Sequence, residues 1–165
     1  MLVVCPYTEI RDETRAALDQ SGYEWEPRFV GGSDTDYFDL LSELWRAGAD
    51  FVIVEHDVVI APSTLDLFDA CPSEWCGSGY PYMRMAAYVG LGCVRFRGEL
   101  TRALPDLMDR VATLDYANHG HRHYCTLDAQ IQNTLHSAGR FVCEHAPVEH
   151  LGRWPSHGCV PAPQG

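Results

Sequence analysis

The sequence predicts a single domain of the α/β class with a mainly parallel central sheet. Short apolar runs alternate with amphipathic stretches through residues 2–70, in the order strand, helix, strand, helix, strand, helix. This order is typical of α/β domains with parallel strands. The length of 165 residues fits one domain, and a chain of this size can bury a sufficient core without disulfides or a structural metal.

Three strands are expected in this first part of the chain. Residues 2–5 are apolar and their run stops at Pro6, residues 23–30 alternate weakly, and residues 51–54 form an uninterrupted run of Phe, Val and Ile. Such a continuous β-branched run is typical of a strand that is covered on both faces. The apolar pattern resumes at residues 58–60.

The helices expected between these strands combine an apolar face with a recognisable end. The first ends at Gly22 and the second at Gly48, because glycine readily adopts the left-handed conformation that follows a helix. Ser33 and Asp34 are candidate N-caps of the second helix. A third helix is expected after Pro62.

The second half of the chain has a more mixed pattern. Its expected elements are an edge strand at 75–82, a strand at 88–96, a helix at 100–111, a loop at 115–125, a helix at 128–138, a short strand at 141–143 and an irregular tail after Gly152. No repeat or linker divides the chain, so we expect one domain over residues 1–152 and a tail over residues 153–165.

The charge of the chain excludes several functions. There are 23 acidic residues against 12 basic ones, every basic residue is Arg, and the formal net charge is −11. Without Lys there can be no Walker-type P-loop and no Schiff-base lysine. The negative charge disfavours unmodified nucleic acid, which requires a cationic surface. Residues 1–82 hold 16 acids and 4 Arg, so an anionic ligand would need a metal cation or Arg from the second half.

The composition favours a cytoplasmic protein. No apolar stretch approaches the ~20 residues that span a membrane, and the first residues lack the basic and apolar regions of a signal peptide. The seven Cys are therefore expected to be reduced thiols. The use of Arg to the exclusion of Lys is typical of proteins encoded by GC-rich genomes, and a phage genome is one candidate source. A phage protein of this kind would be located in the cytoplasm of the host cell.

Glu55, His56 and Asp57 form the most informative motif. They follow the most apolar expected strand, and the ligand of a parallel α/β sheet binds at the carboxyl ends of its strands. Alternation along an extended chain would direct Glu55 and Asp57 to one side, where two carboxylates could bind a hard cation such as Mg²⁺ or Mn²⁺. The alternative is a solvated turn between two strands, but the flanking apolar residues make unpaired charge costly there.

Residues 47–62, AGADFVIVEHDVVIAP, resemble the central segment of the GT-A glycosyltransferases. In that family an apolar strand is followed by a DxD motif, which carries the metal and the diphosphate of a nucleotide sugar; here the motif is Glu-His-Asp. Weaker similarities follow in the family's order at residues 2–7, at 90–97, at Asp128 and at 146–152. The resemblance implies a single-domain, Rossmann-like three-layer sandwich.

The resemblance also implies an enzyme that moves a hexose-type sugar from a UDP- or GDP-sugar donor to an acceptor hydroxyl, with inversion. Asp57 and His150 would hold Mn²⁺ or Mg²⁺, with Glu55 assisting at the first acidic position. Asp128 would be the general base that deprotonates the acceptor. Alternatively, Asp128 is an acidic residue at the start of a helix capped by Thr126, where it would interact favourably with the helix dipole. The alternative for His150 is an ordinary surface residue.

Further candidates for donor binding lie at strand ends and beside the motif: Pro6, Tyr7, Asp34, His56 and Arg95. Tyr7 could stack on the nucleobase and Asp34 could contact the base or ribose, although an exposed tyrosine and a plain N-cap are the alternatives. Arg95, Arg97 or Arg153 could make bidentate contacts with the diphosphate.

His119, His121 and His123 invite a zinc interpretation. Their two-residue spacing and the absence of a CxxC pair favour a flexible polar loop instead, one that could close over donor or acceptor. Cys71 and Cys76 lack a matching second pair, so the sequence does not favour structural zinc.

Two other functions are compatible with the sequence. A metal-dependent nucleotidyltransferase on a similar sheet would release pyrophosphate rather than a nucleoside diphosphate. A non-catalytic nucleotide-binding module would keep the fold with a decayed site. The acceptor is equally open, because a protein, a glycan, a lipid carrier and modified nucleic acid all fit.

Overall fold

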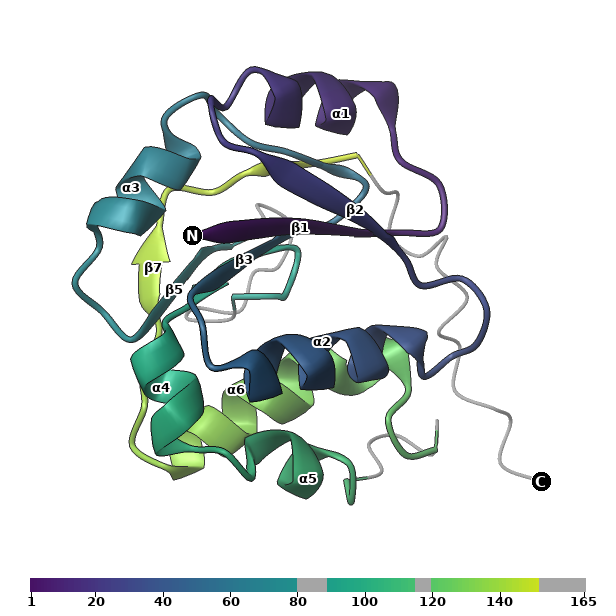
Figure 1. Ribbon diagram of the computed structural model, residues 1–165, viewed down its shortest axis with the longest axis vertical. Coiled ribbons are helices and arrows are strands. Elements are labelled where there is room, and N and C mark those ends of the chain that lie inside the picture. The colour runs from purple at the N-terminus through teal and green to yellow at the C-terminus, as the bar shows by residue number, and fades with distance from the viewer. Residues whose placement is uncertain (80–88, 115–119, 152–165) are drawn as a thin grey trace.

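A computed structural model describes residues 1–79, 89–114 and 120–151 of the chain. A six-stranded sheet lies between two layers of helices (Figure 1). The strands of this sheet are β1 Leu2–Tyr7, β2 Trp25–Phe29, β3 Phe51–Val54, β5 Trp75–Ser78, β6 Cys93–Phe96 and β7 Cys143–His145. The structure confirms the expected α/β three-layer arrangement.

The sheet is mixed but mostly parallel. Its strand order is β2-β1-β3-β6-β5-β7. The pairs β1–β2, β1–β3 and β5–β7 are parallel, whereas β6 runs antiparallel to both of its neighbours, β3 and β5. A second, two-stranded sheet pairs β4 (Val58–Val59) with β8 (Glu149–His150) in antiparallel register. This small sheet joins the segment after β3 to the end of the described chain.

The helices divide between the two faces of the large sheet. They are α1 Asp12–Asp19, α2 Asp36–Ala47, α3 Thr64–Ala70, α4 Gly98–Ala103, α5 Leu107–Val111 and α6 Leu127–Ser137, with a short 3-10 helix η1 at Tyr124–Thr126. Helices α1 and α3 cover one face, and α2, α4, α5 and α6 cover the other (Figure 1). Each face therefore has its own apolar core.

Strand β3 shows why the sequence run at residues 51–54 has no polar position. Phe51 and Ile53 pack into the core under α2, while Val52 and Val54 pack into the core under α1 and α3. All four side chains are almost fully buried. A strand in the middle of such a sandwich buries both of its faces, so both sets of alternate positions are apolar.

Several elements differ from the sequence expectation. The helix expected over residues 100–111 is two helices, α4 and α5, because Pro105 cannot donate the hydrogen bond that a continuous helix needs there. Strand β5 was expected at an edge but lies inside the sheet, between β6 and β7. Strand β7 begins at Cys143, and Phe141, expected within it, is 71% exposed. Strand β1 continues through Pro6, which lies beyond the part of β1 that pairs with β3.

The start of α2 uses a different acid from the expected one. The cap residue is Thr35, and the carboxylate of Asp36 accepts hydrogen bonds from the backbone N–H of Gly32 (2.7 Å) and Ser33 (3.0 Å). Asp34 is left exposed at this end of the sheet. The end of α2 matches the prediction, because Gly48 is in the left-handed conformation, φ 68°.

Some expectations fall on residues outside the described ranges. These are the irregular tail with Arg153 and Trp154, the residues from 80 to 88 of the two expected strands, and His119. The domain boundary at residue 152 stays a prediction for the same reason. The expectation that all seven cysteines are reduced thiols is wrong for Cys125, which is in a disulfide. In the described ranges, no helix has the length and apolar character needed to cross a membrane.

Candidate metal and donor site

The candidate site lies where several strands of the sheet end. Tyr7 ends β1, Glu55 follows β3, and Asp128 lies in the first turn of α6. Ligands of open α/β sheets bind at the carboxyl ends of the strands. The sequence motifs therefore meet at the edge where a ligand is expected.

Glu55, Asp57 and His150 come together at this edge. Each offers one ligand atom, and the three atoms all lie within 4.8 Å of one another. Nε2 of His150 is 3.5 Å from Oδ1 of Asp57, and both side chains are at least nine-tenths buried. The structure thus brings together the three residues for which the resemblance implied a metal site.

Local backbone geometry explains how residues so far apart in sequence meet. The chain turns directly after β3, where the N–H of Val58 donates to the carbonyl of Glu55 (3.1 Å). Val58 then pairs with His150 across the small β4–β8 sheet. The N–H of Leu151 closes the arrangement by donating to the carbonyl of Asp57 (2.8 Å). The side chain of His150 is therefore placed by backbone pairing, not by its own sequence neighbourhood.

The electrostatics of the three residues favour a cation. The pKa of Glu55 is raised to about 8, chiefly by desolvation and also by the charges of Asp57 and Asp128, while a hydrogen bond with Tyr37 opposes this rise. A buried carboxylate among other carboxylates is unfavourable unless a positive charge offsets it. Two carboxylates and one imidazole are donors that suit a divalent metal ion such as Mn²⁺.

Asp128 is partly buried at the start of α6. It lies close enough to Glu55 for its charge to raise the pKa of that carboxyl. The nearby residue Thr126 makes no side-chain capping bond to α6; its hydroxyl lies 3.3 Å from the carbonyl of His123 instead. Thr126 is still the N-cap residue of α6 and Asp128 lies in the first turn, so this placement also fits the helix-dipole alternative.

The donor candidates lie in different surroundings. Pro6 is buried in β1, and the ring of Tyr7 contacts Phe29 edge-on with 5.7 Å between centroids. Asp34 is exposed, with Oδ2 3.6 Å from Nε2 of His123. The carbonyl of His56 accepts a hydrogen bond from the N–H of Arg11 (3.0 Å), which ties the turn after β3 to the start of α1.

Arg95 is not brought to this group. Its side chain is 1% exposed, and its Nη2 donates to the carbonyls of Cys71 (3.1 Å) and Ser73 (2.5 Å) under α3. Arg97 also donates to the carbonyl of Cys71 (2.6 Å). Both guanidiniums therefore organise the backbone after α3.

The sequence did not predict the contacts that two residues, His123 and Tyr37, make with candidate site residues. His123 belongs to the polar loop that the sequence suggested as a closing element. In the structure its imidazole lies next to the carboxylate of Asp34. The N–H of Tyr124 also donates to the carbonyl of Asp34 (3.1 Å). Tyr37 acts on Glu55 from the first turn of α2. For Tyr37 the sequence held no signal beyond its place on the apolar face of a helix.

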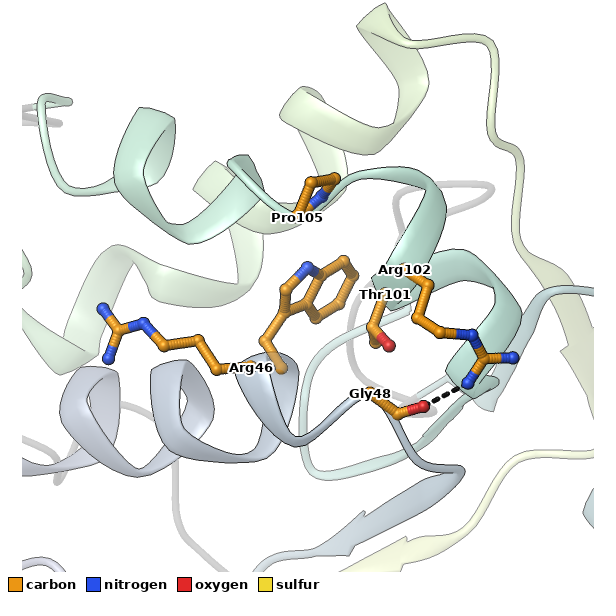
Figure 2. A pocket seen from close by; sticks show the side chains of 6 residues that line it. Arg46, Gly48, Thr101, Arg102 and Pro105 are labelled. Atoms are coloured by element: carbon orange, nitrogen blue, oxygen red, sulfur yellow. Dashed lines mark hydrogen bonds between the residues drawn. The ribbon is translucent and has the colours of Figure 1, made fainter.

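A shallow pocket of about 280 Å³ lies away from this edge (Figure 2). Its lining residues are Trp45, Arg46, Gly48, Thr101, Arg102 and Pro105. They lie near the start of β3, at the opposite end of that strand from Glu55. Arg102 donates to the carbonyl of Gly48, which closes one side of the pocket. None of the predicted site residues lines it.

Comparisons with known proteins identify the fold. No family model matches the sequence, and no curated protein matches it. Among solved structures, the crystal structure of a glycosyltransferase involved in glycosylation of the major capsid of PBCV-1 matches with a TM-score of 0.56. The match covers 88% of this chain and 82% of the viral chain at 9% sequence identity. This chain has a glycosyltransferase-like fold.

This likeness confirms the fold expected from the segment around Glu-His-Asp. At 9% identity the two chains share an architecture rather than a recognisable sequence. The chemistry of the site therefore has to be argued from this chain's own residues, because one fold can host several functions.

Proposed function

We propose that this chain is a metal-dependent glycosyltransferase that transfers a sugar from a nucleotide-sugar donor to an acceptor hydroxyl. The observation that carries the proposal is the convergence of Glu55, Asp57 and His150 at the carboxyl edge of a glycosyltransferase-like sheet. The fold supports the class of reaction, and the three ligand atoms support the use of a divalent cation.

Asp57 and His150 would hold the cation, with Glu55 as the third ligand. When bound, a divalent cation supplies positive charge to the donor diphosphate and to the charge that develops on the leaving phosphate. We favour Mn²⁺ over Mg²⁺ because Mg²⁺ prefers an all-oxygen shell and one ligand here is imidazole. The pair of Asp57 and His150 is preorganised, since backbone hydrogen bonds hold both residues.

Asp128 is the proposed general base. It lies at the same edge as Glu55, partly buried, in the first turn of α6. It would accept the proton of the acceptor hydroxyl as that oxygen attacks the anomeric carbon. Attack from the side opposite the leaving diphosphate would invert the configuration at that carbon.

The proposed donor is a UDP- or GDP-sugar. Tyr7, at the end of β1, and Asp34, in the loop after β2, border the edge where the nucleoside would lie. Because the structure with the similar fold is a glycosyltransferase involved in the glycosylation of a major capsid, a protein or a protein-linked glycan is the acceptor class to test first.

A thermal-shift screen tests the donor and the metal together. UDP- and GDP-sugars are added to the protein with Mn²⁺ or with EDTA, and a ligand that binds the folded state raises the unfolding midpoint. We expect one nucleotide sugar to raise the midpoint only with Mn²⁺, and Asp57→Asn to abolish the shift. Asp109→Asn, an exposed acid on α5, is the matched control.

A turnover assay then distinguishes the chemical classes. Release of a nucleoside diphosphate from the bound donor supports sugar transfer or donor hydrolysis by this site. Release of pyrophosphate would identify a nucleotidyltransferase and overturn the proposal. Binding without turnover on any acceptor, together with no donor hydrolysis, would instead identify a nucleotide-binding module.

A further inference from the structure

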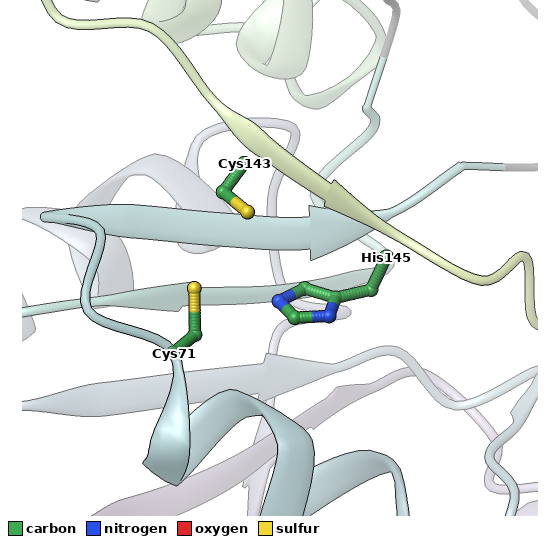
Figure 3. A group of neighbouring side chains, drawn as sticks. All are labelled: Cys71, Cys143 and His145. Carbon is green, nitrogen blue, oxygen red and sulfur yellow. The ribbon is translucent and has the colours of Figure 1, made fainter.

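A second group of potential metal ligands lies at the edge strand β7, and it shares no residue with the donor site. Cys71, Cys143 and His145 each offer one ligand atom, and these atoms all lie within 4.8 Å of one another. Figure 3 shows the two sulfur atoms and the imidazole pointing toward a common point. We propose that these three residues bind Zn²⁺ and that the ion joins the end of α3 to β7.

The sequence could not suggest this group because its members come from different elements. Cys71 is the residue that follows α3, whereas Cys143 and His145 lie two apart on β7. Alternate residues of a strand point to the same face, so both β7 side chains face α3. Strand β7 is set in place by parallel pairing with β5, in which Cys76 lies opposite Cys143 and Ser78 opposite His145. The thiol of Cys76, on the neighbouring strand β5, also contacts Cys71, so it borders the group without being one of its three ligands.

The spacing of the ligand atoms suits zinc after a small adjustment. Zinc–sulfur bonds of about 2.3 Å place two tetrahedral ligand atoms about 3.7 Å apart. The present atoms lie within 4.8 Å of one another, so contraction of about 1 Å at most is needed. Three protein ligands leave a fourth position for a solvent molecule. Cys143 and His145 are both partly exposed, which gives the ion and this solvent molecule access.

The ligands are held by contacts that do not depend on a metal. The carbonyl of Cys71 accepts hydrogen bonds from the side chains of Arg95 and Arg97. Arg95 lies in β6, and Arg97 is the residue that follows this strand. The ring of His145 packs against Phe68 of α3, with 5.3 Å between ring centroids. A site that is held in this way loses little conformational entropy when the ion binds.

The imidazole of His145 supplies an independent observation. Its Nε2 atom is buried and makes no hydrogen bond of normal geometry, and the group that interacts with this side chain is the Cys71 thiol, itself a member of the group. Buried polar atoms in folded proteins nearly always have a well-formed partner, so this weakly satisfied imidazole is consistent with a place for an ion. A zinc ion between this imidazole and the two sulfurs would be that partner.

The proposed ion would also bear on the donor site through the chain. Strand β7 ends at His145, and β8 with His150 follows after the short segment 146–148. Anchoring β7 to α3 would therefore limit the motion of the segment that carries His150. The zinc proposal itself does not rest on the proposed glycosyltransferase activity.

The test uses untagged, reduced protein that has been stripped of metal. Zn²⁺ is titrated in a competition assay, and Co²⁺ is added separately because tetrahedral cobalt with thiolate ligands has a characteristic visible spectrum. We expect one tightly bound equivalent, a thiolate–cobalt spectrum and a zinc-dependent rise in the unfolding midpoint. Cys71→Ala and Cys143→Ser should each lower zinc affinity at least tenfold.

Two control variants distinguish this group from the remaining thiols and from the donor site. Cys93→Ala removes a buried thiol outside the group, and Asp57→Asn alters only the donor site; both should keep wild-type zinc affinity. If Cys71→Ala fails to fold, the zinc affinity of Cys143→Ser, on the edge strand, and the cobalt spectrum of the wild-type protein still test the proposed zinc site. A cobalt spectrum without thiolate bands, wild-type affinity in the Cys143→Ser variant, or a Cys71–Cys143 disulfide in protein prepared without reductant would overturn the proposal.

Discussion

The residues of the Glu55-His56-Asp57 motif have three different surroundings. Asp57 is buried against His150, and its carbonyl is held by Leu151. Glu55 lies between the charges of Asp57 and Asp128, in a desolvated position that raises its pKa to about 8. His56 contributes its carbonyl to the backbone of the next helix. In the structure, two side chains of the motif lie in the candidate site, and the third residue contacts α1 through its backbone.

The raised pKa of Glu55 predicts a pH-dependent stability for the metal-free protein. Below the ordinary carboxyl value of 4.5, both folded and unfolded states hold the proton. Between 4.5 and about 8 only the folded state keeps it, so the free energy of unfolding falls by up to about 1.4 kcal/mol per pH unit. Urea unfolding in EDTA at several pH values measures this slope. Glu55→Gln should flatten it, and an unchanged slope would exclude Glu55 as its source.

The role of Asp128 can be separated from donor binding. Asp128→Asn removes the proposed base with almost no change in shape, so turnover should fall about 10²–10⁴-fold. The affinity for the nucleotide sugar with Mn²⁺ should remain within a few-fold of wild type. Steady-state kinetics and thermal shift measure the two quantities, with Asp109→Asn as control. Turnover at the wild-type rate would remove Asp128 from the mechanism.

At the level of elements, the small β4–β8 sheet sets the position of His150, the proposed metal ligand from the C-terminal segment. The sequence places His150 about ninety residues after Asp57, and only the pairing of Val58 with His150 closes that distance. A two-stranded pair of this length contributes little stability by itself. The sheet instead positions side chains, because it brings the N–H of Leu151 to the carbonyl of Asp57 and the imidazole of His150 to the carboxylate of Asp57.

Substitution of Leu151 tests this element directly. Leu151→Pro removes the N–H that donates to the carbonyl of Asp57 (2.8 Å), whereas Leu151→Ala keeps it. We expect the proline variant to bind Mn²⁺ about tenfold more weakly, and the alanine variant to bind nearly as wild type. Isothermal titration measures both affinities, and circular dichroism verifies that the large sheet persists. Equal affinities in the two variants would show that this hydrogen bond does not position the site.

At the level of the whole molecule, charge and architecture point to the same requirement. The chain carries −11 in total, and its described carboxylates include three that act at one edge of the sheet. Arg95, one of the arginines predicted to contact the diphosphate, is buried and bonds to the backbone after α3 instead. We therefore expect an anionic diphosphate at this edge to require a bound cation.

This dependence predicts how nucleotides respond to ions. UDP or GDP should raise the unfolding midpoint with millimolar Mn²⁺ and leave it unchanged in EDTA. Sodium chloride at the same ionic strength should not replace Mn²⁺, because screening weakens repulsion without supplying a ligand at short range. Differential scanning fluorimetry measures the three conditions. A nucleotide-induced shift of equal size in EDTA would contradict a metal-bridged donor.

The α/β order of the first half and the place of the carboxylates after β3 could both be predicted from the sequence. These follow from local rules: a continuous apolar run must be buried on both faces, and Gly48 must end a helix. Three contacts could not be predicted in this way: Arg95 bonds to the backbone after α3, Cys71 lies beside Cys143 and His145, and His150 lies beside Asp57. These contacts depend on the order and the register of the strands. Register between strands that are distant in sequence is set by tertiary packing, which a local sequence pattern cannot predict.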